Sequence, residues 1–327
     1  MKEALHISFH DGCLADVDYL FAGKDIKIKK IKIERKISSD FDITREKAFS
    51  IAPYLRGIIG DYKNVIFSDT APLARALSVC PDLFDGKKTF HYICNRFNYG
   101  VSDIKRYNQD FKTLLERKDS IFSVYTPYEN YYIKKYGINI ELPVIRPTGL
   151  GINNVIKSEH MSSDFSGNNY GLLMPYLNEK IFSKKITHDS LYFGKYKGAS
   201  ELNKFNFFIH FPYAFSNYFL FELLRVGKPI YIPTISLIIK LLKSKKINYH
   251  FQDLPRRKRY LIGNTKLVEI IKLSEWYSNE YSSFLTYFES IDHLNRLIKV
   301  ESHNNPMRNN YIEPVDSYID NIYSFFE

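Results

Sequence analysis

Residues 207–233 read FFIHFPYAFSNYFLFELLRVGKPIYIP. The apolar run Phe207–His210 predicts a buried strand, and Pro229–Ile232 predicts a second one. Between them, Ser216 starts a predicted helix that Gly227 ends. A strand, a helix and a strand in this order favour two parallel strands of one sheet joined by a crossover helix.

The helix between these strands carries polar residues that packing alone does not require. Ser216 and Asn217 stand at its predicted N-terminus, where free backbone amides can hold an anion. Glu222 follows within an otherwise apolar helix, and a carboxylate in such surroundings needs a partner. The alternative is an ordinary α/β domain with a glutamate at a helix edge.

The same alternation of strand and helix runs through the first half of the chain. Strands are expected at Leu5–Phe9, Ile26–Ile33, Asn64–Ser68, Lys88–Cys94, Ile121–Val124 and Pro143–Ile145. A first helix is expected after His10-Asp11-Gly12 and up to Phe21, and further helices at Thr44–Gly57, Thr70–Val79, Ser102–Arg117 and Pro127–Tyr136. Because Ile26–Ile33 alternates apolar and charged residues, this strand is expected to be half exposed and near a sheet edge.

A second series of strands and helices follows a polar stretch at Ser162–Asn169. Strands at Tyr170–Met174 and Leu191–Phe193 come before the segment 207–233, and a helix is expected at Ile235–Lys243. The sequence therefore predicts an α/β fold with two doubly wound, Rossmann-like domains, residues 1–150 and 151–310. Residues 311–327 are expected to form a C-terminal helix with one apolar face, made by Val315, Tyr318, Ile319, Ile322 and Phe326.

Length and composition exclude several classes of protein. A chain of 327 residues corresponds to about two domains, and a hydrophobic fraction of 45 % excludes a disordered chain. Three cysteines without a CxxC pair exclude a disulfide scaffold and a zinc ribbon, and they favour a reducing compartment. The apolar runs are far shorter than the ~18–20 residues of a membrane span, and the N-terminus MKEALHISFH does not resemble a signal peptide. A cytoplasmic protein is therefore expected.

The segment 207–233 resembles the donor-binding motif of GT-B glycosyltransferases. The likeness extends to the run from Gly194-Lys-Tyr-Lys-Gly198 through His210 to Glu222, which is similar to exostosin-like and related uncharacterised transferases. The resemblance implies that Glu222 accepts hydrogen bonds from the ribose of a nucleotide sugar. It also implies that two domains face a cleft and that the C-terminal helix crosses back to the first domain. The contacts to the diphosphate, the sugar and the base then fall on Pro212, Tyr213, Ser216, Asn217 and Tyr196.

The resemblance also directs the search for a general base. Many retaining members carry a second glutamate eight positions before the first; Ala214 stands there, so an inverting mechanism is favoured and a retaining one stays open. An inverting transfer needs a base for the acceptor hydroxyl, at the end of a strand of the first domain. The candidate catalytic residues are His10, Asp11 and Asp69, and the candidate acceptor or phosphate contacts are Gly12, Asn95 and Arg96. The alternatives are helix capping for the two aspartates, a structural role for His10 and a salt bridge for Arg96.

No metal or other cofactor is expected, because no DxD motif follows a predicted strand. Asp16 and Asp18 have that spacing but fall inside the first predicted helix, where a solvated face is expected. Lys180, Lys184 and Lys185 are candidates for neutralising the diphosphate, and the alternative is that they are simply solvated. Walker A and GxGxxG patterns are absent, which argues against an NTPase or a dehydrogenase.

The stretch 240–259 is strongly basic, in a chain with a net charge of +10. It could meet an anionic membrane or a phosphorylated lipid carrier, or it could be a solvated basic loop. No RNP motif, helix-turn-helix or zinc finger supports nucleic acid as a partner. The sequence thus predicts a glycosyltransferase that uses a nucleotide sugar and a glycan or lipid-linked acceptor. The alternative is a non-catalytic binding protein, either a degenerate transferase or a basic nucleic-acid-binding module.

Overall fold

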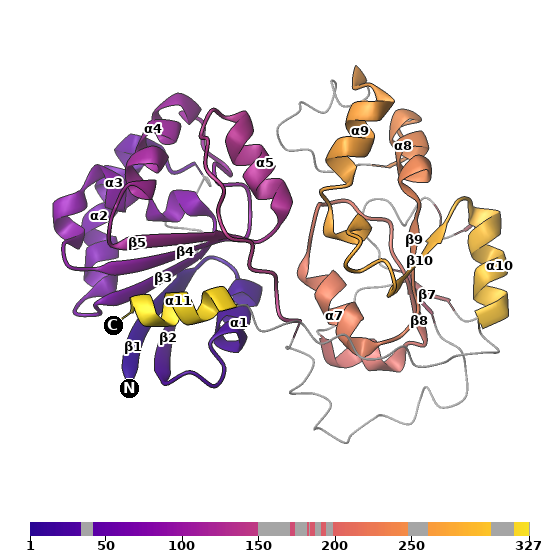
Figure 1. Ribbon diagram of the computed structural model, residues 1–327, viewed down its shortest axis with the longest axis horizontal. Helices are drawn as coiled ribbons and strands as arrows, with labels where there is room; N and C mark the ends of the chain where they lie inside the picture. Colours follow the sequence, from indigo (N-terminus) through magenta and orange to yellow (C-terminus); the bar gives the residue numbers. More distant parts are fainter. Residues whose placement is uncertain are drawn as a thin grey trace. The chain divides into compact units, whose positions relative to one another are not determined.

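The computed structural model describes residues 1–33, 42–149, 171–173, 182, 184–186, 191–193, 199–247, 261–301 and 317–326. The chain divides into two compact units (Figure 1). Unit 1 consists of Met1–Thr148 and Pro314–Glu327, and unit 2 consists of Gly149–Glu313. Each unit is built on a five-stranded sheet in which all strand pairs are parallel.

The sheet of unit 1 has the strand order β2-β1-β3-β4-β5. Its strands are β1 (Lys2–Ser8), β2 (Ile26–Lys32), β3 (Asn64–Asp69), β4 (Lys88–Ile93) and β5 (Ser120–Val124). The inner strands β3 and β4 are almost fully buried because helices cover both faces, and even their polar residues Ser68, Thr89 and His91 are buried. Strand β2 lies at the edge and alternates half-buried isoleucines with exposed lysines, as the sequence predicted.

In the described part of unit 1, the strands of this sheet are followed by the helices α1 (Asp11–Leu20), α2 (Arg45–Ile59), α3 (Arg75–Val79), α4 (Ile104–Leu115) and α5 (Pro127–Lys135). Figure 1 shows α1 on one face of the sheet and α2, α3 and α4 on the other. The helix expected at Thr70–Val79 is split, since the 3-10 turn η2 (Ala71–Ala74) precedes α3. The strand expected at Pro143–Ile145 is reduced to one bridge between Val144 and Val124, because Pro143 has no N–H to extend the ladder.

The C-terminal helix α11 (Ser317–Phe325) packs on unit 1, on the same face of the sheet as α1 (Figure 1). The rings of Phe326 and Phe21 stack with centroids 6.4 Å apart. The Lys2 ammonium donates to the carbonyl oxygen of Tyr323 at 2.8 Å. The predicted return of the last helix to the first domain is therefore confirmed.

The sheet of unit 2 has the order β10-β9-β8-β6-β7. Its strands are β6 (Gly171–Leu173), β7 (Leu191–Phe193), β8 (Phe207–Ile209), β9 (Ile230–Pro233) and β10 (Leu285–Phe288). Figure 1 shows α7 (Tyr218–Val226) on one side of this sheet and α10 (Ile291–Glu301) on the other. The other helices among the described residues of this unit are α8 (Ile235–Lys243) and α9 (Asn264–Ile271), with the 3-10 turns η7 (Ala199–Lys204) and η9 (Glu275–Tyr277).

The core of unit 2 forms where α7 packs on the sheet. Phe219, Leu220, Leu223 and Leu224 of α7 are buried in a cluster that also contains Trp276. The predicted α/β fold with two doubly wound parallel sheets is thus confirmed. One boundary differs: α7 begins at Tyr218 and is capped by Asn217, so Ser216 precedes the cap.

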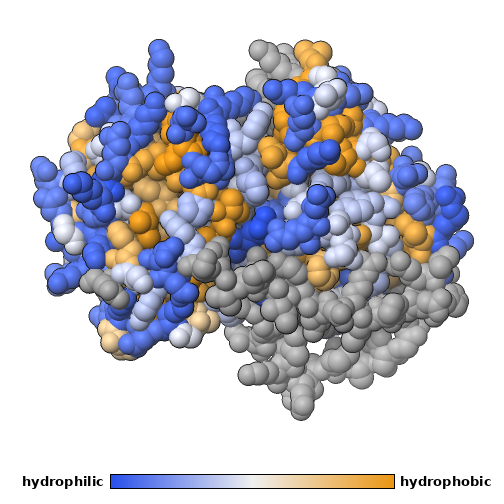
Figure 2. Space-filling model, viewed as in Figure 1, coloured by the Kyte–Doolittle hydropathy of each residue, from blue (hydrophilic) through white to orange (hydrophobic). Residues whose placement is uncertain are grey.

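Large apolar side chains are scattered over the surface. Figure 2 shows apolar areas interspersed with hydrophilic ones on the face that it draws. Among the residues that the structure describes, the exposed large hydrophobic ones are Met1, Phe49, Tyr54, Leu83, Ile104 and Leu261. Single exposures of this kind are normal for a folded protein. Within the described part of the chain, no helix has both the length and the apolarity needed to cross a membrane.

Candidate functional site

The strand orders point to one edge of each sheet. In unit 1 the chain leaves β1 toward β2 on one side and returns to β3 on the other. In unit 2 strands β6 and β8 have the same relationship. Open α/β sheets bind ligands outside the carboxyl ends of such strand pairs. The segments beginning at His10, at Asp69 and at His210 all leave their strands at these edges.

His10 is the N-cap of α1 and is held by its own helix. Its Nδ1 accepts a hydrogen bond from the Gly12 N–H at 3.0 Å, and its backbone N–H donates to the Ser8 hydroxyl at 3.2 Å. A neutral ring that accepts at Nδ1 carries its proton on Nε2. The neutral His10 therefore offers a donor, not an acceptor, at its second nitrogen.

The groups around His10 favour its charged form. A hydrogen bond with the Cys13 side chain raises the pKa of His10, and the nearby carboxylates of Asp69 and Asp11 act in the same direction. The structure therefore brings three of the predicted residues together, since both aspartates act electrostatically on one imidazole. The charged imidazolium is therefore favoured, and histidine is a residue that can take part in proton transfer.

Asp11 is the most exposed member of this group. It is the first residue of α1 and forms an ion pair with Lys32 at the end of β2. The Asp11 side chain is 76 % exposed. The hydrogen bond from Lys32 lowers the pKa of the Asp11 carboxyl, which makes it a weaker base.

Asp69 ends β3 with an unusual backbone. Its φ is +80°, a conformation that costs a non-glycine residue about 1–3 kcal/mol. Its carbonyl oxygen accepts hydrogen bonds from the N–H groups of Cys94 and Asn95 at 3.1 and 3.0 Å. These bonds join the chain leaving β3 to the chain leaving β4. The strained residue is therefore a predicted catalytic residue. It lies at the switch point of the sheet, which is the place between β1 and β3 where the strand order reverses.

Arg96 is turned away from this edge into the interior. It forms an ion pair with Glu129 of α5, and the two side chains are 9 % and 0 % exposed. Its guanidinium also lies 5.2 Å from the Tyr128 ring centroid. The Arg96 N–H donates to the Asn95 side chain at 2.9 Å. The structure therefore agrees with the alternative that Arg96 forms a salt bridge, because its charge is paired with Glu129.

Asp16 corrects one expectation from the sequence. The Asp16–Asp18 pair was expected on a solvated face, but Asp16 is only 4 % exposed. It accepts two hydrogen bonds from Thr148, and burial raises its pKa to about 7. Asp18 does lie near the surface, where its carboxylate pairs with Lys30 at 2.5 Å. The expectation was therefore wrong for Asp16.

In unit 2 the segment after β8 carries the turn residues of the predicted donor site. Pro212 is buried and Tyr213 is half-buried. The Tyr213 ring lies edge-on to His210, with centroids 6.0 Å apart. His210 in turn packs on Trp276 at 4.6 Å. This aromatic packing fixes the turn against the core of the unit.

The helix α7 presents its N-terminus at the end of this turn. The Asn217 side chain accepts a hydrogen bond from the Leu220 N–H at 3.1 Å. The Ser216 hydroxyl oxygen is buried and has no hydrogen-bond partner among the described residues. Glu222 is half-buried on the second turn of α7. The positive end of the helix dipole and a carboxylate thus lie on one short helix.

Four predicted contacts lie on or beside parts of the chain that are not described. Lys180 and Tyr196 lie outside the described residues. Lys184 is described and is exposed, as is Lys185. The carbonyl oxygen of Lys185 accepts a hydrogen bond from the Asn295 side chain at 3.2 Å.

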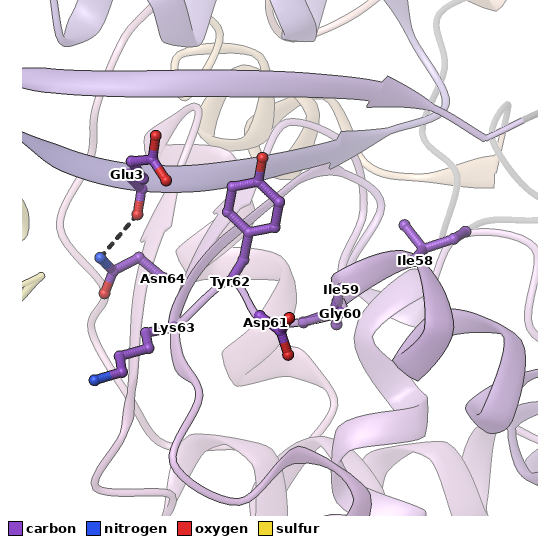
Figure 3. Close-up of a pocket in the computed structure, with 8 residues that line it drawn as sticks. All are labelled: Glu3, Ile58, Ile59, Gly60, Asp61, Tyr62, Lys63 and Asn64. Atoms are coloured by element: carbon purple, nitrogen blue, oxygen red, sulfur yellow. Dashed lines mark hydrogen bonds between the residues drawn. The ribbon is translucent and has the colours of Figure 1, made fainter.

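A hollow of about 480 Å³ opens at the opposite edge of the unit 1 sheet (Figure 3). Its lining residues are Glu3, Ile58, Ile59, Gly60, Asp61, Tyr62, Lys63 and Asn64. They come from the amino ends of β1 and β3 and from the end of α2. The Asn64 side chain donates to the Glu3 carbonyl oxygen at 3.0 Å across it. Since parallel sheets bind ligands at their carboxyl ends, the hollow is separate from the candidate site.

No protein-family model and no curated protein matches the chain. Among solved structures, the chain is similar to one assigned as a UDP-N-acetylglucosamine 2-epimerase from Listeria monocytogenes, with 12 % identity and a TM-score of 0.44 over 96 % of this chain and 100 % of that chain. It is similar to a glycosyltransferase from Streptomyces sp. SF2575, with 8 % identity and a TM-score of 0.37 over 91 % of this chain and 100 % of that chain. Neither likeness assigns the chain to a family.

Proposed function

We propose that this protein is a glycosyltransferase that moves a sugar from a nucleotide-sugar donor to a hydroxyl group of a glycan or lipid-linked acceptor. The observation that carries the proposal is the unit β8–α7–β9. The chain turns at Pro212, α7 starts behind the Asn217 cap, and Glu222 stands half-buried on its second turn. This order of features suits a ligand with one anionic and one hydroxyl-rich part.

Each part of the donor then has a chemical counterpart. The N-terminal end of α7 favours the diphosphate through its dipole, with Ser216 and Asn217 beside it. Glu222 accepts hydrogen bonds from ribose hydroxyls, and Tyr213 contacts the sugar. Tyr196 and the lysines 180 and 184 complete the site as proposals from the sequence. The described residues contain no cluster of histidine, cysteine, aspartate or glutamate side chains that could hold a metal, and we expect the reaction to proceed in the presence of a chelator.

The acceptor side of the reaction falls to unit 1. We assign the base to the group His10, Asp11 and Asp69 and place Asp69 first. The neutral His10 carries its proton on Nε2, and Asp11 is exposed and paired with Lys32. Asp69 acts electrostatically on His10 and ends a buried strand, which fixes its backbone. An inverting reaction would use one such base, with Gly12 and Asn95 near the acceptor.

Nucleotide binding tests this proposal. Thermal unfolding of the wild type is measured with UDP, GDP, CMP and TDP, and we expect one of them to raise the melting temperature. Glu222→Gln should weaken binding of that nucleotide by about 1–3 kcal/mol, because it removes a charged acceptor. Glu269→Gln on α9 is the matched control, since Glu269 is exposed, and should bind like the wild type. If none of the four nucleotides binds, the donor class is wrong.

A further inference from the structure

Asp16 is a buried carboxyl group that the proposed transfer does not use. It lies on α1 and is 4 % exposed. Its Oδ1 accepts hydrogen bonds from the backbone N–H of Thr148 at 2.9 Å and from the Thr148 hydroxyl at 3.1 Å. Its Oδ2 lies 3.2 Å from the hydroxyl oxygen of Tyr92 on β4. One carboxyl group therefore joins α1, β4 and the last residue of unit 1.

The hydrogen bonds in this cluster depend on whether Asp16 carries a proton. The Tyr92 hydroxyl oxygen also lies 3.0 Å from the carbonyl oxygen of Ile145. A tyrosine hydroxyl has one proton, and a carbonyl oxygen can only accept. An ionised Asp16 and Ile145 therefore compete for the same proton, and one buried acceptor loses its partner. If Oδ2 carries a proton, Asp16 donates to Tyr92, Tyr92 donates to Ile145, and every bond is made.

The cluster lies where the chain leaves unit 1, so the proton affects how that segment is held. The chain leaves unit 1 through the segment from Ile145 to Thr148, because unit 2 begins at Gly149. We propose that Asp16 binds a proton in the folded protein and that the protonated acid clamps residues 145–148 to α1 and β4. Loss of that proton leaves one of the clamp's bonds unmade and loosens the exit from unit 1.

The surroundings of Asp16 place this change near neutral pH. Burial raises its pKa to about 7, although the hydrogen bonds from Thr148 and Tyr92 act in the opposite direction. The titratable groups that face the cluster are Cys13 on α1, Tyr92 on β4, and Cys94 and Tyr125 beside Tyr92. Burial raises the pKa of Tyr92 and of Cys94 well above their usual values. The groups with the largest effects on the pKa of Asp16 are Thr148, Cys13 and Tyr92, which carry no positive charge.

Hydrogen exchange at the Thr148 amide tests the clamp, because that N–H donates to Asp16. Exchange is measured at pH 5.5 and pH 8 and corrected for the intrinsic rate. A carboxyl group with a pKa of about 7 is roughly nine-tenths ionised at pH 8. Opening of the segment returns Asp16 to water and to an ordinary pKa, so opening becomes about tenfold more favourable per pH unit until pH 7. We therefore expect protection of Thr148 in the wild type to fall about 30-fold between the two pH values.

Two variants separate the clamp from general effects of pH. Asp16→Asn reproduces the neutral acid, since its amide donates to Tyr92 and its oxygen accepts from Thr148, and it should keep its protection at pH 8. Asp18→Asn removes the carboxylate that pairs with Lys30 near the surface of α1, and should follow the wild type. Equal pH dependence in the wild type and Asp16→Asn would overturn the proposal.

An infrared measurement on the wild type decides the question without any variant. Protein labelled with ¹³C at the aspartate side-chain carboxyl should show a protonated carboxyl band at pH 6 that disappears by pH 8. Ordinary aspartates are ionised throughout this range. Absence of the band at pH 6 would show that Asp16 is ionised in the folded protein and that the clamp holds no proton.

Discussion

Arg75 and Asp103 form a bidentate ion pair inside unit 1. Nη1 lies 2.6 Å from Oδ1, and Nη2 lies 2.8 Å from Oδ2. The same guanidinium donates from Nε to Asp110 at 2.8 Å and from Nη1 to the Ile43 carbonyl oxygen at 2.8 Å. Arg75 opens α3, Asp103 precedes α4, and Ile43 precedes α2. One buried side chain thus joins three helices that cover the same face of the sheet.

Replacing Arg75 should be strongly destabilising. The Arg75 side chain is fully buried, and Arg75→Met would leave Asp103 without its cation and Asp110 with only Arg45, which lies 3.7 Å away. We expect the free energy of unfolding to fall by about 3–5 kcal/mol, measured by urea denaturation. The matched control is Arg106→Met, because Arg106 and its partner Glu46 are 61 % and 69 % exposed. That variant should lose less than about 1 kcal/mol, and equal losses in the two variants would contradict the argument.

The C-terminal helix should contribute measurably to the stability of unit 1. Ile322 of α11 is fully buried against that unit. Ile322→Ala removes buried methyl and methylene groups and leaves a cavity, so we expect a loss of about 2–5 kcal/mol in urea denaturation. Asn321→Ala, on the exposed side of the same helix, serves as the control and should stay within about 0.5 kcal/mol of the wild type. A negligible loss for Ile322→Ala would mean that α11 is not docked in solution.

Two buried histidines should make the protein sensitive to acid. Burial lowers the pKa of His6 and of His91 to about 3 each. Between pH 3 and pH 6.5 the unfolded chain binds these protons and the folded chain does not. Stability from each histidine is therefore complete above pH 6.5 and is lost as the pH falls, with a slope of about 1.4 kcal/mol per pH unit.

The variant His91→Gln isolates one of these protons. His91 bonds to the Thr89 hydroxyl at 2.9 Å, and glutamine can keep such a bond. The difference in unfolding free energy between the wild type and His91→Gln is measured from pH 4 to pH 6, so that other titrating groups cancel. That difference should change by about 1.4 kcal/mol per pH unit. A constant difference would show that His91 takes up its proton without unfolding.

The strands were easiest to predict where the pattern of apolar residues followed directly from their burial. Strand β3 carries the apolar run Val65-Ile66-Phe67, β4 carries Phe90, Tyr92 and Ile93, and β2 alternates as an edge strand should. Strand β10 was missed because it is short and its middle residues, Thr286 and Tyr287, are only half-buried. The helices α9 and α10, which flank β10 in the sequence, were missed with it.

The candidate site was predictable only as far as local order determines it. The capping role of His10 and the turn at Pro212 follow from neighbouring residues. The burial of Asp16 depends on Thr148, 132 residues away, and no local pattern contains that partner. A weaker signal was present, because Asp16 lies three residues after the buried Cys13 on the same face of α1. Glu129, the partner of Arg96 on α5, could likewise not be predicted from the residues next to Arg96 in the sequence.

The last prediction concerns the base of the proposed transfer. His10, Asp11 and Asp69 lie together at the carboxyl edge of unit 1, and their chemistry differs. His10 uses Nδ1 to cap α1, so a neutral ring has no lone pair left for an acceptor hydroxyl. Asp11 is bound to Lys32 and has a lowered pKa, which weakens it as a base. Asp69 is held at the switch point by the hydrogen bonds to its carbonyl oxygen.

Turnover of the single variants should therefore separate the three residues. Asp69→Asn keeps the size of the side chain and should lower turnover about 10²–10⁴-fold while nucleotide binding stays unchanged. Asp11→Asn should lower turnover less than about tenfold, because it removes an exposed ion pair. His10→Asn retains a good capping residue and should also stay within about tenfold. If His10→Asn has the largest effect, the capping bond must break during the reaction, and the imidazole is the base.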